Sequence, residues 1–179
     1  LAIRRSLDIH KSALVMIAVA DLAPNKGHAD LIRALGVLKP ELDRGLDHGW
    51  ALICVGREDG TLWDLVRLAR QEGVDHHVKF LGSRNDVADL LKAADIGLHC
   101  PHEEGFPTAV IEGMAAGLPM IVSDAGVLTH DRRLHNALAV YHSTKPTRPR
   151  RVDQSIRHRA AIEWRVVAAV QSAVIRHDH

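Results

Sequence analysis

Short apolar runs rich in branched residues alternate with longer segments of helical period along the first two thirds of the chain. Five of these runs predict β-strands, at residues 14–20, 51–55, 78–81, 96–100 and 119–122. Nearly every residue in them is apolar, as expected when helices cover both faces of a parallel sheet. The alternation predicts an α/β fold with a doubly wound, Rossmann-like parallel sheet.

The segments between these runs have the spacing of amphipathic helices. Helices are predicted at 28–38, 61–72 and 86–94, the first with Leu31, Leu35 and Leu38 on one stripe. In a doubly wound sheet, ligands bind beyond the carboxyl ends of the strands. The loops that follow four of the predicted strands therefore form the candidate site, and they comprise residues 21–26, 56–60, 82–85 and 101–107.

Charge and glycine content divide the chain near residue 127. Residues 1–127 hold 13 Lys and Arg against 18 Asp and Glu, whereas residues 128–179 hold 10 against 4. All 13 glycines lie at or before Gly126. We predict one nucleotide-sugar-binding domain over 1–127 and an atypical basic tail over 128–179, either disordered or translated out of frame. The chain begins with Leu1 and reads as a fragment without a signal peptide.

Several function classes are disfavoured by what the chain lacks. No apolar run reaches the ~18 residues of a membrane span, which predicts a soluble domain with at most peripheral contact to the inner membrane face. The cytoplasmic location is predicted from the two cysteines. The basic run at 145–151 has no interleaved aromatic residues, so no nucleic-acid partner is expected. The Gly-x-Gly-x-x-Gly fingerprint is absent after the first strand, which argues against a dehydrogenase. No cofactor is expected.

Cysteine and histidine near the strand ends permit two interpretations. Cys54 and Cys100 both lie in apolar runs and are expected to be core residues of a protein in a reducing compartment. His99, Cys100 and His102 could suggest a metal site, but alternate residues of a strand point to opposite faces. We therefore predict no metal.

Two glutamates eight positions apart carry the strongest chemical signal. Glu104 and Glu112 bracket the stretch EGFPTAVIE, in which Pro107 suits the first position of a helix. The amino terminus of that helix would offer N–H groups to a phosphate, and the two carboxylates could accept hydrogen bonds from sugar hydroxyls. A sugar diphosphate has both kinds of group. Taken alone, the pair could also arise by chance on any helix.

The sequence around these glutamates resembles a known family. EGFPTAVIEGMAAGLPMIVSDAG resembles the Glu-x7-Glu segment of the group-one (family four) retaining glycosyltransferases of the GT-B fold. Further blocks resemble the same family in the same order over residues 13–126, namely NKGHADLIRAL, ALICVGRED and VKFLGSRNDVADLLKAADIGLHCP. The resemblance implies the carboxy-terminal, donor-binding half of a two-domain enzyme.

The resemblance also implies roles for individual residues. Lys26 would neutralise the diphosphate and, with Glu104 facing the donor sugar, would be catalytic. Glu112 would bind the ribose hydroxyls. Arg84 would lie near the nucleobase, unless it is a solvated surface residue. The implied nucleotide-sugar-binding residues are Gly27, Arg84, Gly105, Phe106, Pro107, Thr108 and Glu112.

What the resemblance implies about partners follows from the family. The donor would be a UDP or GDP sugar, and the acceptor, a glycan or lipid, would bind mainly to an amino-terminal domain that this chain lacks. The fragment alone is expected to be inactive. The alternatives are a nonfunctional or binding-only remnant and, less well matched by the EGFP segment, a sugar-nucleotide epimerase.

Two departures from the family pattern stand out. Asp21 occupies a position where the family often has Arg, so either its carboxylate turns away from the phosphates or donor affinity is reduced. After the segment SDAG the glycines, the Asp-Gly turn and the closing helices of the family are missing. This loss motivates the hypothesis that the reading frame changes near Val127, which the nucleotide sequence of the gene would test.

Overall fold

The computed structural model describes residues 2–123, which include the predicted sheet and all of the predicted site residues. The predicted basic tail and the proposed change of reading frame lie outside the described residues. Within them, no helix is long and apolar enough to cross a membrane.

Within residues 2–123, five parallel strands form one sheet, as the apolar runs predict. The strands are β1 (Leu14–Val19), β2 (Trp50–Val55), β3 (Val78–Phe80), β4 (Ile96–His99) and β5 (Met120–Val122). Their order across the sheet is β3-β2-β1-β4-β5, with every neighbouring pair parallel. The order reverses direction at β1, which is the doubly wound arrangement that right-handed crossovers produce. The predicted fold class is confirmed.

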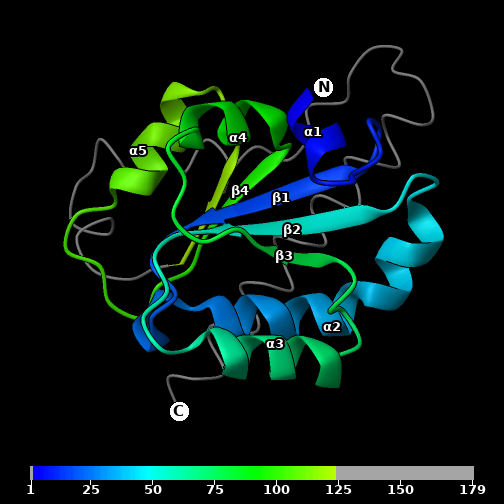
Figure 1. Ribbon diagram of the computed structural model, residues 1–179, viewed down its shortest axis with the longest axis horizontal. Coiled ribbons are helices and arrows are strands. Elements are labelled where there is room, and N and C mark those ends of the chain that lie inside the picture. Colours follow the sequence, from blue (N-terminus) through cyan, green and yellow to red (C-terminus); the bar gives the residue numbers. More distant parts are fainter. Residues whose placement is uncertain (1, 124–179) are drawn as a thin grey trace.

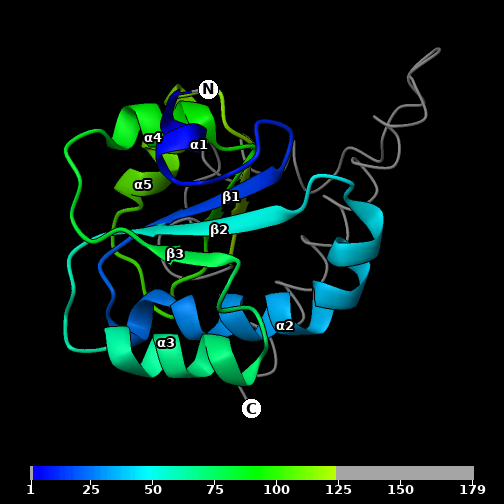
Figure 2. The same cartoon turned by 45° about the vertical axis from the view of Figure 1, so that its right-hand side comes forward.

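Helices cover both faces of the sheet (Figures 1 and 2). One layer consists of α2 (His28–Gly45) and α3 (Leu62–Gln71), and the other of α1 (Ala2–Ser6), α4 (Val87–Ala93) and α5 (Thr108–Ala115). Each layer encloses its own apolar core against one sheet face. Because both faces are buried, the strands can be almost wholly apolar.

Helix boundaries differ from the sequence predictions in three places. The helix predicted to end at residue 38 continues through Pro40 to Gly45, because Leu42 extends the apolar stripe and is buried against the sheet. The last long helix begins at Thr108, since Pro107 precedes it with a non-helical ψ of 67°. The short helix α1 has no amphipathic pattern and was not expected from the sequence.

The two cysteines are core residues, as predicted. Cys54 and Cys100 are both unpaired and buried. Burial raises the pKa of each thiol to about 12, so both stay protonated and chemically inert at neutral pH.

Candidate functional site

An open cavity of about 510 Å³ lies at the carboxyl edge of the sheet. It lies between the loop after β1, which contains the short 3-10 helix η1 (Pro24–Lys26), and the loop after β4. Its lining residues are Asn25, Lys26, His102, Glu103, Glu104 and Gly105. The edge of the sheet that the topology rule selects is therefore where the cavity is found.

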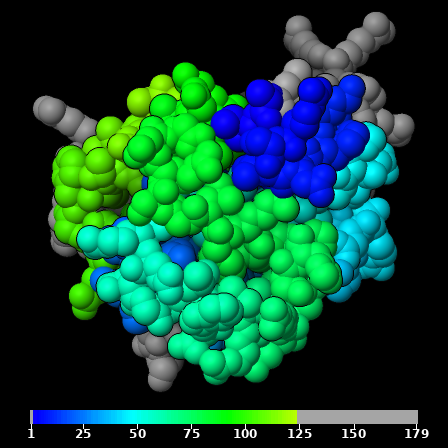
Figure 3. Space-filling view, in the orientation of Figure 1, coloured from blue at the N-terminus to red at the C-terminus, as the bar shows by residue number. Residues whose placement is uncertain are grey.

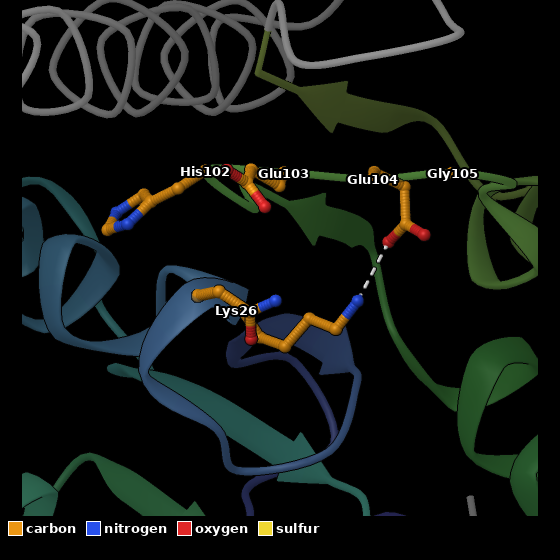
Figure 4. A pocket seen from close by; sticks show the side chains of 6 residues that line it. Lys26, His102, Glu103, Glu104 and Gly105 are labelled. Carbon is orange, nitrogen blue, oxygen red and sulfur yellow. Dashed lines mark hydrogen bonds and ion pairs between the residues drawn. The ribbon is translucent and has the colours of Figure 1, made fainter.

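Lys26 and Glu104, the two residues predicted to be catalytic, face one another across this cavity. The Lys26 Nζ atom donates a hydrogen bond to Glu104 Oε2 at 3.2 Å, although the residues are 78 positions apart (Figure 4). Both side chains are only partly exposed. The cavity thus holds a cation and a carboxylate side by side, which suits a ligand that carries both an anionic group and hydroxyl groups.

Gly27 allows the two loops to meet. Its φ of 73° lies in the left-handed region, and a Cβ atom there would lie 1.8 Å from the carbonyl oxygen of Cys100. No side chain fits in that space, so the start of α2 can lie directly against the end of β4 only with glycine at this position. Gly27 therefore supports the site through backbone packing and does not itself line the cavity.

Two buried histidines lie close to the Lys26 and Glu104 pair. His99, the last residue of β4, is 5% exposed, and its Nε2 atom lies 3.3 Å from Glu104 Oε2 without the alignment of a hydrogen bond. Burial lowers the pKa of His99, Glu104 opposes that shift, and Lys26 adds to it. His28 is 2% exposed with neither ring nitrogen hydrogen-bonded to the described residues, and burial, assisted by His99, lowers its pKa to about 4. Both rings are therefore expected to be neutral at pH 7.

The sequence analysis considers His99 only for a metal site and assigns His28 no role, so it does not predict that the two buried rings lie beside this ion pair. His28 stands beside the predicted phosphate-binding Lys26 and Gly27, and His99 ends an otherwise apolar strand. A polar residue at the carboxyl end of a buried strand was the available signal, because such positions face the ligand edge.

His102 has a different partner from His99. Its Nε2 atom lies 2.7 Å from Asp30 Oδ2, and its backbone N–H donates to the Asn25 carbonyl at 2.8 Å. His99 and His102 thus do not converge on one point. Among residues 2–123, no group of three or more His, Cys, Asp or Glu side chains is placed to hold a metal ion.

The remaining predicted binding residues are distributed around the cavity. Gly105 lines it, whereas Phe106 is 65% exposed and Pro107 is buried at the start of α5. Thr108 is exposed, and its backbone N–H donates to the Phe106 carbonyl at 2.9 Å. Glu112 is exposed on the second turn of α5 and does not line the cavity as it stands.

Two charged residues in neighbouring loops are engaged with partners of their own. Arg84 forms a two-pronged contact with the Asp86 carboxylate, at 2.8 and 2.7 Å, and lies outside the cavity lining. That hydrogen bonding raises the pKa of Arg84 and lowers that of Asp86. The Asp21 carboxylate accepts hydrogen bonds from the Arg57 backbone N–H at 3.0 Å and from its guanidinium at 2.8 Å. The carboxylate at the position where the resemblance leads us to expect arginine is thus paired with Arg57.

Comparisons with known proteins agree with this architecture. The sequence profile described as "Glycosyl transferases group 1" matches residues 2–131. The chain is 34% identical over 131 residues to the D-inositol 3-phosphate glycosyltransferase of Actinosynnema mirum, covering 70% of this chain and 31% of that protein.

Two solved structures share the fold. One is WaaG, a glycosyltransferase involved in lipopolysaccharide biosynthesis, with a TM-score of 0.66, 24% identity, and coverage of 98% of this chain and 45% of that one. The other is Anabaena Alr3699/HepE in complex with UDP-glucose, with a TM-score of 0.61, 21% identity, and coverage of 98% and 51%. The chain spans about a third of the length of the curated relative and about half of each structure.

Proposed function

Because the chain belongs to the group 1 glycosyl transferases and has the fold of one half of a GT-B enzyme, we propose that it binds a nucleotide-diphosphate sugar for retaining transfer to an acceptor hydroxyl. The juxtaposition of Lys26 and Glu104 at the carboxyl edge of the sheet carries the proposal. A diphosphate needs a cation and a sugar needs hydrogen-bond acceptors, and the cavity presents both within one hydrogen bond of each other.

In this proposal Lys26 stabilises the leaving nucleoside diphosphate. When the bond between the sugar and the diphosphate breaks, negative charge grows on the phosphate oxygens, and an ammonium group placed there stabilises the transition state more than the ground state. In the structure the Lys26 ammonium donates a hydrogen bond to Glu104. We expect it to turn toward the phosphates when the donor enters, which frees the Glu104 carboxylate to accept hydrogen bonds from the sugar.

The start of α5 supplies the second set of contacts. We propose that Gly105, Phe106, Pro107 and Thr108 form a backbone rim along the sugar and phosphates, where a helix amino terminus favours an anion. Glu112 would accept hydrogen bonds from the ribose hydroxyls. Its exposed carboxylate, one turn along the helix from that rim, is accessible to a ligand.

UDP is the first nucleotide to test, since the HepE structure of the same fold was solved with UDP-glucose. The WaaG likeness makes a glycan or lipid acceptor the first to consider, bound mainly by an amino-terminal domain of the complete enzyme. We propose that this chain alone has no transferase activity and that the complete enzyme works in the cytoplasm. The free, buried thiols are compatible with that compartment.

Calorimetric titration of the 179-residue chain with UDP and with GDP tests the donor proposal, using Glu112→Ala as the probe. Asp64→Ala on α3 is the matched control, because it also removes an exposed helical carboxylate. We expect one nucleotide to bind, Glu112→Ala to weaken it by about tenfold or more, and Asp64→Ala to leave it unchanged. Failure of the unmodified chain to bind either nucleotide would instead support the nonfunctional remnant.

Transfer itself requires a second experiment that supplies the amino-terminal half of a GT-B enzyme. The chain would be combined with an amino-terminal domain of a relative and assayed for sugar transfer from the nucleotide that binds. Nucleotide binding without transfer in that complex would favour a binding-only remnant over an enzyme domain.

A further inference from the structure

His102 connects the loop of residues 101–107 to η1 by one contact and to the first turn of α2 by another. Its backbone N–H donates to the Asn25 carbonyl at 2.8 Å, and its side-chain Nε2 atom lies 2.7 Å from Asp30 Oδ2. Since a carboxylate can only accept, the ring nitrogen is the donor in the second contact. The two bonds hold the loop by its backbone and by its side chain.

Asp30 is a firm anchor because it is buried. The residue is 2% exposed, lies in the first turn of α2, and also accepts a hydrogen bond from the Arg33 guanidinium at 3.0 Å. A negative charge near the amino terminus of a helix is stabilised by the helix dipole. A buried carboxylate that loses a partner is costly, so the bond to His102 resists opening.

The His102 and Asp30 contact joins the same two segments as the Lys26 and Glu104 contact. His102 lies two residues before Glu104, and Asp30 lies four residues, about one helical turn, after Lys26. The Lys26 and Glu104 contact borders the cavity and, under the proposed function, opens when phosphate takes the ammonium. The His102 and Asp30 contact involves neither of these groups and can persist with ligand present.

We propose that His102 is a positioning residue for the donor site, holding the 101–107 loop against α2 through Asp30 so that Glu104 and Gly105 remain opposite Lys26. The inference rests on the proposed function for the identity of the ligand. The two contacts of His102, with Asn25 and with Asp30, are a property of the fold, and we call them the clasp. Although the His102 side chain is 41% exposed at the cavity, its assigned role is exerted through Asp30.

Three substitutions in the 179-residue chain test the clasp. His102→Leu removes the side-chain donor, His102→Gln keeps an N–H donor at a similar reach, and Asp30→Asn keeps the shape but removes the charge. His76→Leu is the matched control, because the His76 side chain is 92% exposed on another loop. Amide hydrogen exchange without added nucleotide measures how readily the loop opens. Titration with UDP and GDP measures nucleotide affinity.

With His102→Leu we expect the amide of residue 102, which donates to the Asn25 carbonyl, to exchange at least about tenfold faster than in the unmodified chain after correction for its intrinsic rate, while the Leu52 amide in β2 is unchanged. Nucleotide affinity should fall by about tenfold in His102→Leu, because the proposed phosphate-binding rim that begins at Gly105 is no longer held in place, and it should recover to within about threefold in His102→Gln. Asp30→Asn should lie between the two. His76→Leu should match the unmodified chain.

The proposal is overturned if His102→Leu leaves loop exchange unchanged, or if His102→Gln is as impaired as His102→Leu. Should His102→Leu fail to fold, the comparison of His102→Gln with Asp30→Asn decides, and equal exchange in both and in the unmodified chain refutes the clasp. If the unmodified chain binds neither nucleotide, the proposed function fails for this chain. The clasp is then judged by loop exchange alone.

Discussion

Two ion pairs lie at opposite ends of the sheet and differ in how fully their donors are used. Near the amino ends of the strands, the Arg4 guanidinium bonds to the Asp95 carboxylate at 2.9 Å and to the carbonyls of Lys11, Ala13 and Ala93 at 2.8 to 2.9 Å. Asp95 also accepts from the backbone N–H of Val15. This largely buried network fixes α1 beside α4, where Figure 3 shows the two segments in contact at the surface.

The pair at the carboxyl ends is far less complete. Among the described residues, one hydrogen bond is found for the Lys26 ammonium, to Glu104, and the pair borders an open cavity. The buried histidines beside it, His28 and His99, have ring nitrogens without hydrogen bonds to residues 2–123. Extensive hydrogen bonding at one end serves stability, whereas at the other end Lys26 keeps donor capacity that no described residue uses, beside an open cavity.

Replacing Arg4 tests the ion pair near the amino ends of the strands and should have the largest effect on stability. Arg4→Ala leaves the Asp95 carboxylate and several carbonyls short of a donor, so we expect the free energy of unfolding to fall by about 3 kcal/mol. Urea denaturation measures this loss. Arg5→Ala, an exposed arginine on the same helix, should change stability by less than about 0.5 kcal/mol. Nucleotide binding by folded Arg4→Ala should be unchanged, and a selective loss of binding would break the comparison.

Acid should lower the free energy of unfolding through His28, which is buried beside the Lys26 and Glu104 pair. Its pKa is about 4 in the folded state against 6.5 when unfolded, so between these values the unfolded chain binds more protons and stability falls as the pH falls. From about pH 7 to about pH 5 the expected loss from His28 is about 2 kcal/mol. Urea midpoints of the unmodified chain and of His28→Leu, compared at both pH values, measure it. Identical pH dependence in the two proteins would refute the assignment.

Removing the cation of the site should affect binding more than folding. Lys26→Ala takes away the ammonium that we assign to the diphosphate, and UDP or GDP affinity should fall by about tenfold. Stability should change by less than about 1 kcal/mol, since the pair has a single partially solvated contact. Lys92→Ala, an exposed lysine on α4, is the control. Unfolding of Lys26→Ala would show that both ion pairs are structural.

The smallest expected effect tests whether Glu104 competes with the diphosphate for Lys26 or orients Lys26 toward it. In the structure Glu104 holds the ammonium that a diphosphate would need, so Glu104→Gln should tighten binding of UDP, which has no sugar, by about twofold to threefold. Calorimetry with UDP and the unmodified chain as reference measures the change. Weaker binding of UDP would mean that Glu104 orients Lys26 and does not compete for it.

The sequence was most informative where burial alone determines structure. The five apolar runs predicted the five strands found in the described part of the chain and their parallel arrangement, because residues covered on both faces are expected to be apolar. The end of α2 was misjudged at Pro40, since the benefit of burying Leu42 is a tertiary effect that outweighs a local helix-breaking preference.

The candidate site likewise has features that the sequence predicts and features that only the tertiary structure decides. The sequence by itself indicated the carboxyl edge of the sheet, and of the four predicted loops those at 21–26 and 101–107 supply the cavity lining, whereas those at 56–60 and 82–85 do not. The family resemblance pointed to Lys26, Glu104 and Gly105 within these loops, and their roles stay predictions. The fold decided which groups touch: Lys26 pairs with Glu104 and Asp30 with His102, across separations of 78 and 72 residues. Neither pair could be read from a local pattern, because contacts between distant segments depend on how the loops after β1 and β4 pack together in three dimensions.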